Sequence, residues 1–201
     1  MKPGWGAAFL LALSAAAPAH LLRGASFFRE GDFVNALVEF QVAQMRREGP
    51  DATWYVAACL TKLKRPEDAL EAFSEARARA PEADDALLDF YEALASHDAR
   101  LYLHASDLLA RLGNRAGPKL SEEARILRRR IEALFRAAPA EDAVDWYFTK
   151  AAIATSTRHF VLAQLYGEEA LALGRRRAAC YRCAEAQHAL EALRPPPGPR
   201  P

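Results

Sequence analysis

The sequence predicts an all-α protein, a short α-solenoid of antiparallel helical hairpins that ends in a C-terminal capping helix. Three observations support this fold class. Apolar residues recur at spacings of three and four, prolines separate the periodic segments, and residues 31–43 align with residues 64–76. The alignment gives a period of about 33 residues, which is typical of stacked helical hairpins. A single hairpin leaves one apolar face uncovered, so neighbouring hairpins are expected to share a continuous core.

Residues 1–19 have the features of a secretory signal peptide. Lys2 is the single early charge, an apolar run interrupted by one serine spans residues 7–16, and Ala17-Pro18-Ala19 places small residues at both cleavage-determining positions. The run is about half as long as a membrane-spanning helix requires. Because Pro18 disfavours cleavage after Ala17, we expect cleavage after Ala19 and export to the periplasm or the extracellular space. The alternative is an uncleaved first helix.

Composition limits the classes of partner. The chain has 201 residues, of which 51% are hydrophobic, and a formal net charge of +1. Half apolar content is enough for one sizeable core or a short solenoid. A near balance of acidic and basic residues gives no electrostatic case for a nucleic acid or an anionic membrane as partner. No later segment is long and apolar enough for a transmembrane helix.

The first six predicted helices pair into three hairpins, at residues 20–49, 50–83 and 84–112. These helices span residues 21–30, 33–47, 52–64, 66–80, 85–96 and 100–112. Pro66 and Glu67 suit the start of the fourth helix. Residues 113–120 form the clearest loop, and Ser121 is expected to cap a long helix with Glu122 and Glu123 in its first turn.

The rest of the region 121–193 is predicted to hold a degenerate hairpin and the capping helix. Helices are expected at residues 140–155, 158–173 and 175–193. The proline-rich residues 194–201 cannot pack as a helix and are expected to form a disordered tail.

Small and aromatic residues recur at fixed places in the hairpins, around a Gly31-Asp32-Phe33 turn in the first and before Pro81 in the second. This pattern resembles tetratricopeptide repeats (TPR) of the exported bacterial type, in which Gly or Ala lets two helix backbones approach where a larger side chain would overpack. In the third hairpin Tyr91 stands where a small residue is expected, and in the last hairpin Gly167 replaces an aromatic. The resemblance implies these packing positions: Gly24, Ala36, Phe40, Ala43, Ala57, Ala69, Phe73, Ala76, Ala151, Ala163 and Ala170.

The same resemblance implies that the first helix of each hairpin lines a concave groove for a peptide segment. Leu21, Ala25 and Tyr55 stand where carboxylate-clamp members carry Lys and Asn, which excludes a C-terminal carboxylate clamp. Adjacent helical residues diverge by about 100°, so one of Trp54 and Tyr55 is expected to pack between repeats instead. The expected groove residues are Leu21, Leu22, Phe28, Arg29, Trp54, Tyr55, Thr61, Lys62, Leu88, Asp89, Glu92 and Phe148.

The expected function is therefore that of a noncatalytic scaffold or adaptor of the periplasm or cell envelope. Its partner would be a segment of another exported or envelope protein, and no cofactor, metal or catalytic residue is predicted. The alternatives are a helical accessory part of an envelope enzyme and a thiol-redox protein that uses Cys180 and Cys183.

The Cys180-Tyr181-Arg182-Cys183 segment leaves two interpretations open. Haem attachment requires His after the second cysteine, where Ala184 stands, and a redox pair normally follows a strand that is not predicted here. Zinc requires about four ligands, which the neighbouring sequence does not supply. What remains is a pair of small buried residues or a disulfide, and Cys59 is expected to be a buried thiol.

Overall fold

The computed structural model describes residues 19–49, 51–80, 86–136, 143–177 and 183–193, and these ranges contain helices and no strands. The prediction of an all-α fold is confirmed. Pro81, the signal-peptide residues before Ala19 and the proline-rich tail lie outside the described residues. The elements are α1 (Ala19–Glu30), α2 (Phe33–Met45), α3 (Asp51–Lys62), α4 (Pro66–Arg79), α5 (Ala86–Asp98), α6 (Tyr102–Leu112), η1 (Gly113–Arg115), α7 (Pro118–Arg136), α8 (Ala143–Ser156), α9 (Phe160–Arg177) and α10 (Cys183–Leu193).

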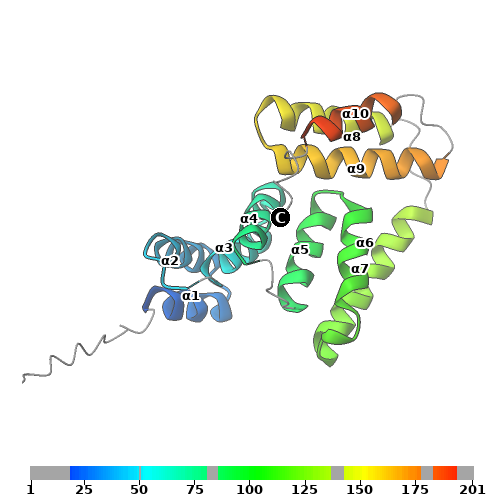
Figure 1. Cartoon of the computed structure of the whole chain (residues 1–201). Helices are drawn as coiled ribbons and strands as arrows, with labels where there is room; N and C mark the ends of the chain where they lie inside the picture. Colours follow the sequence, from blue (N-terminus) through cyan, green and yellow to red (C-terminus); the bar gives the residue numbers. More distant parts are fainter. Residues whose placement is uncertain (1–18, 50, 81–85, 137–142, 178–182, 194–201) are drawn as a thin grey trace, which may run out of the picture.

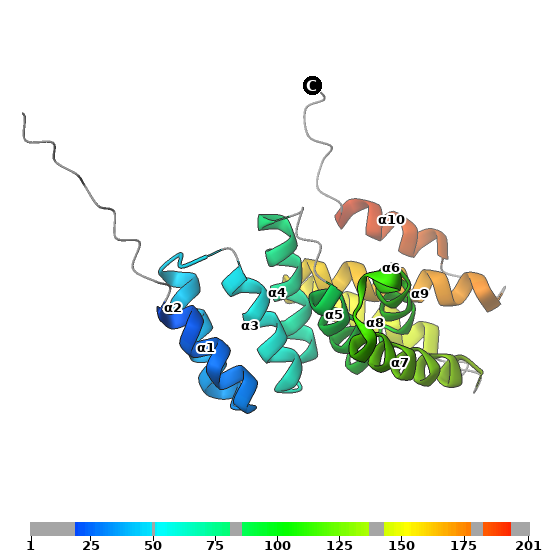
Figure 2. The ribbon, with the colours of Figure 1, turned by 90° about the horizontal axis from the view of Figure 1, so that it is seen from below.

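The helices pack as adjacent pairs in a solenoid-like arrangement. The α1–α2, α3–α4 and α5–α6 hairpins follow one another from left to right in Figure 1, and Figure 2 shows the same progression. The long helix α7 packs against α5 and α6. The α8–α9 hairpin then lies across the ends of α5 and α6 and contacts α4 as well, while α10 packs on α9 (Figure 1).

Four hairpins turn through one backbone motif. Gly31, Lys64, Arg100 and Arg158 adopt left-handed φ angles of 84°, 60°, 65° and 64°. In each turn the N–H of this residue donates to the carbonyl three residues back, and the next N–H donates to the carbonyl five residues back, at 2.8–3.2 Å. This pair of bonds satisfies carbonyls that the end of a helix leaves open. The motif fixes where the second helix begins relative to the first.

Small residues recur at fixed distances from the left-handed residue. Seven residues before it lie Gly24, Ala57, Ala93 and Ala151, and five residues after it lie Ala36, Ala69, Ala105 and Ala163. The four alanines of the second set are fully buried, with 0% of their surface exposed. A Cβ added to Gly24 would lie 2.7 Å from the ring of Phe40, so a larger residue at this position would overpack the hairpin.

This register corrects the prediction for the third hairpin. Ala93, which is fully buried, occupies the small position that the sequence comparison had assigned to Tyr91. The third hairpin is therefore a repeat in its packing residues as well as in its shape.

Gly167 departs from the pattern to accommodate α10. It lies nine residues after its turn, where the first two hairpins have Phe40 and Phe73. A Cβ on Gly167 would meet Leu190 of α10 at 2.7 Å. The space of the missing aromatic is thus occupied by a side chain of the capping helix. The predicted start of that helix at residue 175 is wrong, because residues 175–177 continue α9.

The long helix begins earlier than predicted. α7 starts at Pro118, where proline loses no hydrogen bond because the first N–H of a helix has no partner within the helix. The hydroxyl of Ser121 donates to the carbonyl of Ala116 at 3.1 Å inside the first turn. The buried stripe of Ala124, Leu127 and Ile131 covers α5 and α6.

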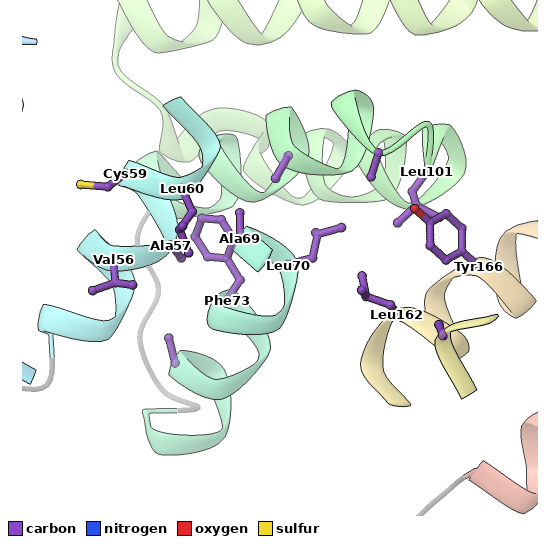
Figure 3. Close-up of a cluster of buried hydrophobic side chains, with 14 of the residues drawn as sticks. Val56, Ala57, Cys59, Leu60, Ala69, Leu70, Phe73, Leu101, Leu162 and Tyr166 are labelled. Carbon is purple, nitrogen blue, oxygen red and sulfur yellow. The ribbon is translucent and has the colours of Figure 1, made fainter. Parts of the chain in front are cut away.

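Contacts between residues distant in the sequence hold the α8–α9 hairpin in place. Tyr147 of α8 donates its hydroxyl hydrogen to the carbonyl of Arg100 at 2.5 Å. Glu169 of α9 accepts from the N–H groups of Leu103 and His104, at 2.7 and 3.2 Å, and so caps α6. Figure 3 shows the apolar part of this junction, where Leu70, Leu101, Leu162 and Tyr166 come together.

We expect Glu169 to make stability depend on pH. Burial raises its pKa to about 7 from the ordinary 4.5. The folded state therefore binds this proton more tightly than the unfolded chain, and the resulting stability is complete below pH 4.5 and lost as the pH rises through 7. Within that window each pH unit changes the free energy of unfolding by up to about 1.4 kcal/mol.

Urea unfolding of the wild type and of Glu169→Gln between about pH 5 and pH 8 measures this contribution. The two proteins share every other side chain, so the difference between them isolates Glu169. The free energy of the wild type relative to the variant should fall as the pH rises. A difference that does not change with pH would contradict the assignment.

Candidate binding surface

An aromatic cluster lies where α1, α2, α3 and α5 meet. The ring of Phe28 packs edge-on against Phe33 at 5.3 Å and against Tyr91 at 5.9 Å between centroids. The ammonium nitrogen of Lys62 lies 5.1 Å from the Tyr91 ring and 6.0 Å from the Phe33 ring. The three rings are half-buried and Lys62 is exposed. We call these four residues the Lys62 surface.

The hairpin turns position this surface. Phe28 lies three residues before Gly31, Phe33 two residues after it, and Lys62 two residues before the next left-handed residue, Lys64. Three of its four members thus come from the ends of helices that the turn motif fixes. Tyr91 completes the surface from the middle of α5.

The Lys62 surface carries an uncompensated positive charge. Within the described ranges no carboxylate pairs with Lys62, whereas the neighbouring Lys64 forms an ion pair with Asp98 at 2.8 Å. Arg29 is exposed and, among the residues that the structure describes, donates only to the carbonyl of Ala25 in its own helix. Cation–π contacts of an exposed lysine contribute about 0.5 to 1 kcal/mol, so they orient the ammonium group without neutralising it.

The Tyr91 hydroxyl is not an ionised group at neutral pH. Burial raises the pKa of Tyr91 above its ordinary value, and the negative charge of Glu123 raises it further. Tyr91 therefore offers a neutral ring and a hydroxyl beside the Lys62 ammonium. The surface can hold an apolar side chain against its rings and an acidic group beside Lys62.

Two expected groove residues are buried instead. Trp54 is 2% exposed and packs between α3 and α4, 6.1 Å from the Phe73 ring and 5.3 Å from the guanidinium carbon of Arg77. Thr61 is buried and donates its hydroxyl hydrogen to the carbonyl of Ala57 at 2.9 Å. Neither side chain can contact a partner without repacking of the hairpin, so neither is a groove residue.

Glu92 and Asp89 are also buried, in an ionic network between the second and third hairpins. Arg77 of α4 donates to Asp89 at 2.6 Å and to Glu92 at 2.9 Å, and Arg115 donates to Asp89 at 2.5 Å. Burial opposes ionisation, but bonds from His104 and Arg77 hold the pKa of Glu92 below its ordinary value. These carboxylates join two hairpins and are not groove residues.

The other expected groove residues lie around the core. Tyr55 is half-buried and its ring stacks on that of Phe40 at 4.9 Å between centroids. Of the adjacent pair Trp54 and Tyr55, it is therefore Trp54 that packs fully inside. Leu21, Leu88 and Phe148 pack partly against the main hydrophobic cluster, while Leu22 is exposed. Of the predicted groove, the structure brings Phe28 and Lys62 together, and it adds Phe33 and Tyr91. The correct register of the third hairpin would have identified Tyr91, because it then aligns with Tyr55.

The thiol of Cys59 is poorly suited to nucleophilic or redox chemistry. Cys59 is fully buried, and burial raises its pKa to about 12, so the reactive thiolate is scarce. Cys180 lies outside the described residues, and the side chain of Cys183 is likewise not described. Within the described part of the chain, no three His, Cys, Asp or Glu side chains are grouped so that they could hold a metal ion.

None of the described helices combines the length and apolar character that a membrane crossing requires. No protein-family model, no curated protein and no solved structure matches the chain.

Proposed function

We propose that this protein is a noncatalytic scaffold of the TPR type that binds a segment of another protein at the Lys62 surface. The observation that carries the proposal is the exposed ammonium of Lys62, which no carboxylate of the described ranges pairs with, beside three half-buried rings from the first and third hairpins. Stacked hairpins that share one turn register support the TPR assignment.

The chemistry of the surface defines the bound segment. Phe28 and Tyr91 supply flat apolar area at a low cost in conformational entropy, which is typical of binding hot spots. Lys62 and Arg29 occupy equivalent places two residues before successive turns and have no carboxylate partner in the described ranges. The proposed ligand is therefore a peptide segment that places an acidic residue next to an apolar one.

We expect Lys62→Glu to weaken partner binding at least tenfold, because it puts a negative charge where the proposed ligand carries one. The partner is obtained by affinity capture from the exported fraction, and its binding segment is then titrated by fluorescence anisotropy. Lys119→Glu is the matched control, since Lys119 is an exposed lysine on α7 and is not one of the four residues of the surface. Loss of binding for Lys119→Glu with full binding for Lys62→Glu would refute the proposal.

We also propose that the protein is exported and cleaved between Ala19 and His20. α1 begins at Ala19, so cleavage there would remove a single residue of this helix. The His20 nitrogen lies 2.9 Å from Oε2 of Glu48, and the His20 ring lies 2.7 Å from Glu39. A free ammonium group is unfavourable at a helix N-terminus, and these two carboxylates would offset that cost.

Mass spectrometry of the protein recovered from cells should place the mature start at His20. The reason for this expectation is the pair of small residues, Ala17 and Ala19, that stands before the cleaved bond. Recovery of the chain with Met1 intact, in a membrane fraction, would contradict cleavage and export.

A further inference from the structure

A groove of about 550 Å³ lies between α4 and the N-terminal end of α9. Its apolar lining comes from Ala72 and Ala78 of α4 and from Phe160 and Val161 of α9. Phe160 is 53% exposed, so more than half of an aromatic side chain is left accessible in this groove. Aromatic-lined grooves are the surfaces on which extended, proline-rich segments dock.

The α4 side of the groove is acidic. Among the described lining residues are three carboxylates, those of Asp68, Glu71 and Glu75, and one guanidinium, that of Arg158. Each carboxylate is paired with a side chain that is half or more exposed, and these partners are Arg65, His159 and Arg79. Exposed ion pairs are weak, so these carboxylates can exchange a partner or accept a second one. The groove therefore suits a segment that carries positive charge.

The last helix of the chain leads towards this groove. α10 runs antiparallel to α9, because Gln187 accepts from Arg175 at 3.2 Å and Leu190, three residues later, packs on Gly167. Figure 2 shows α10 alongside α9. The end of α10 at Leu193 therefore lies towards the N-terminal half of α9.

One face of α9 holds α10 and then continues into the groove. Gln164 and Leu171 line a hollow between α9 and α10, and Phe160 lies four residues before Gln164 on the same face. Leu193 lies about 4.5 Å beyond Leu190 along α10, which brings the end of α10 level with Gln164. The chain that follows α10 thus starts about one helical turn from Phe160.

The sequence of that chain matches the groove in charge and in length. Residues 194–201, which lie outside the described residues, read Arg-Pro-Pro-Pro-Gly-Pro-Arg-Pro and contain two arginines and no acidic residue. Proline-rich sequences favour polyproline II, which advances about 3.1 Å per residue, so eight residues reach about 25 Å. The α4 lining from Asp68 to Ala78 spans about 15 Å of helix.

We propose that residues 194–201 bind in the groove between α4 and α9 of their own chain. The prolines contact Phe160 and Val161, and the guanidinium groups of Arg194 and Arg200 pair with the carboxylates of α4. A tethered segment has an effective concentration in the millimolar range, which favours it over a proline-rich segment of another protein. The bound tail links α4 to the α8–α9 hairpin and covers the exposed ring of Phe160.

This groove is separate from the Lys62 surface. None of the four residues that form the Lys62 surface lines the groove. The inference therefore goes beyond the proposed function and can fail or succeed independently of it.

Photocrosslinking from the groove tests the inference. p-Benzoylphenylalanine replaces Phe160 in the full chain, cells that produce the protein are irradiated, and the adducts are separated by mass and sequenced. We expect an adduct within one chain that joins position 160 to residues 194–201. The same crosslinker at Ile153, which is 54% exposed on α8 and does not line the groove, should give no adduct with these residues.

Charge reversal in the tail should weaken this contact. Arg194→Glu together with Arg200→Glu should lower the yield of the adduct at least about threefold, because the tail then repels the carboxylates of α4. Arg129→Glu together with Arg130→Glu is the matched control, since it changes the net charge equally at exposed positions on α7. This control and Lys62→Glu should both leave the yield unchanged, which separates the groove from the proposed function.

The other possible occupants of the groove are outcomes that would overturn the proposal. These are an adduct with the tail of a second copy of this chain and an adduct with a proline-rich segment of another protein. Absence of an adduct with residues 194–201 would also overturn it, as would a yield that the tail substitutions do not lower or that the α7 control lowers equally. Circular dichroism verifies that every variant keeps the helical content of the wild type.

Discussion

The structure depends on the close approach of two helix backbones in each hairpin. A left-handed residue ends the first helix, and a fully buried alanine follows five residues later in all four hairpins. Three of these turns place Lys or Arg in a conformation that glycine adopts without strain, so the packed hairpin must offset a cost of about 1 kcal/mol or more at each turn. Three of the four members of the Lys62 surface take their positions from this register.

Local signals predicted much of the fold. Spacing of apolar residues, together with Pro66 and the Gly31 turn, located the first six helices to within a few residues, because these signals act within one or two helical turns. The third hairpin was misaligned by two residues, because its small position was assigned to Tyr91 without Arg100 being recognised as the left-handed residue of the turn. When Arg100 is taken as the left-handed residue of the turn, Ala93 occupies the small-residue position seven residues before it. Tyr91 then lies on the side of α5 that faces Lys62.

The placement of α8–α9 could not be predicted in the same way. Its anchors join residues that are distant in the sequence, such as Tyr166 with Glu67, which are 99 residues apart. Glu169 is adjacent to Glu168 in the sequence, yet Glu169 is buried as the cap of α6 while Glu168 is exposed. Which member of such a pair turns inward is decided by the neighbouring hairpin, as it is for Trp54 and Tyr55. The same dependence explains why Trp54, Thr61 and Glu92 are structural rather than groove residues.

The central claim is that one register governs all four hairpins, and the third hairpin tests it most directly because there the register differs from the alignment that the sequence predicted. The measurement is the free energy of unfolding of Ala105→Leu, compared with Ala110→Leu on the exposed side of the same helix. The account predicts that Ala105→Leu destabilises by about 1 to 3 kcal/mol through overpacking, whereas Ala110→Leu changes stability by less than about 0.5 kcal/mol. Equal stability of the two variants would contradict the shared register.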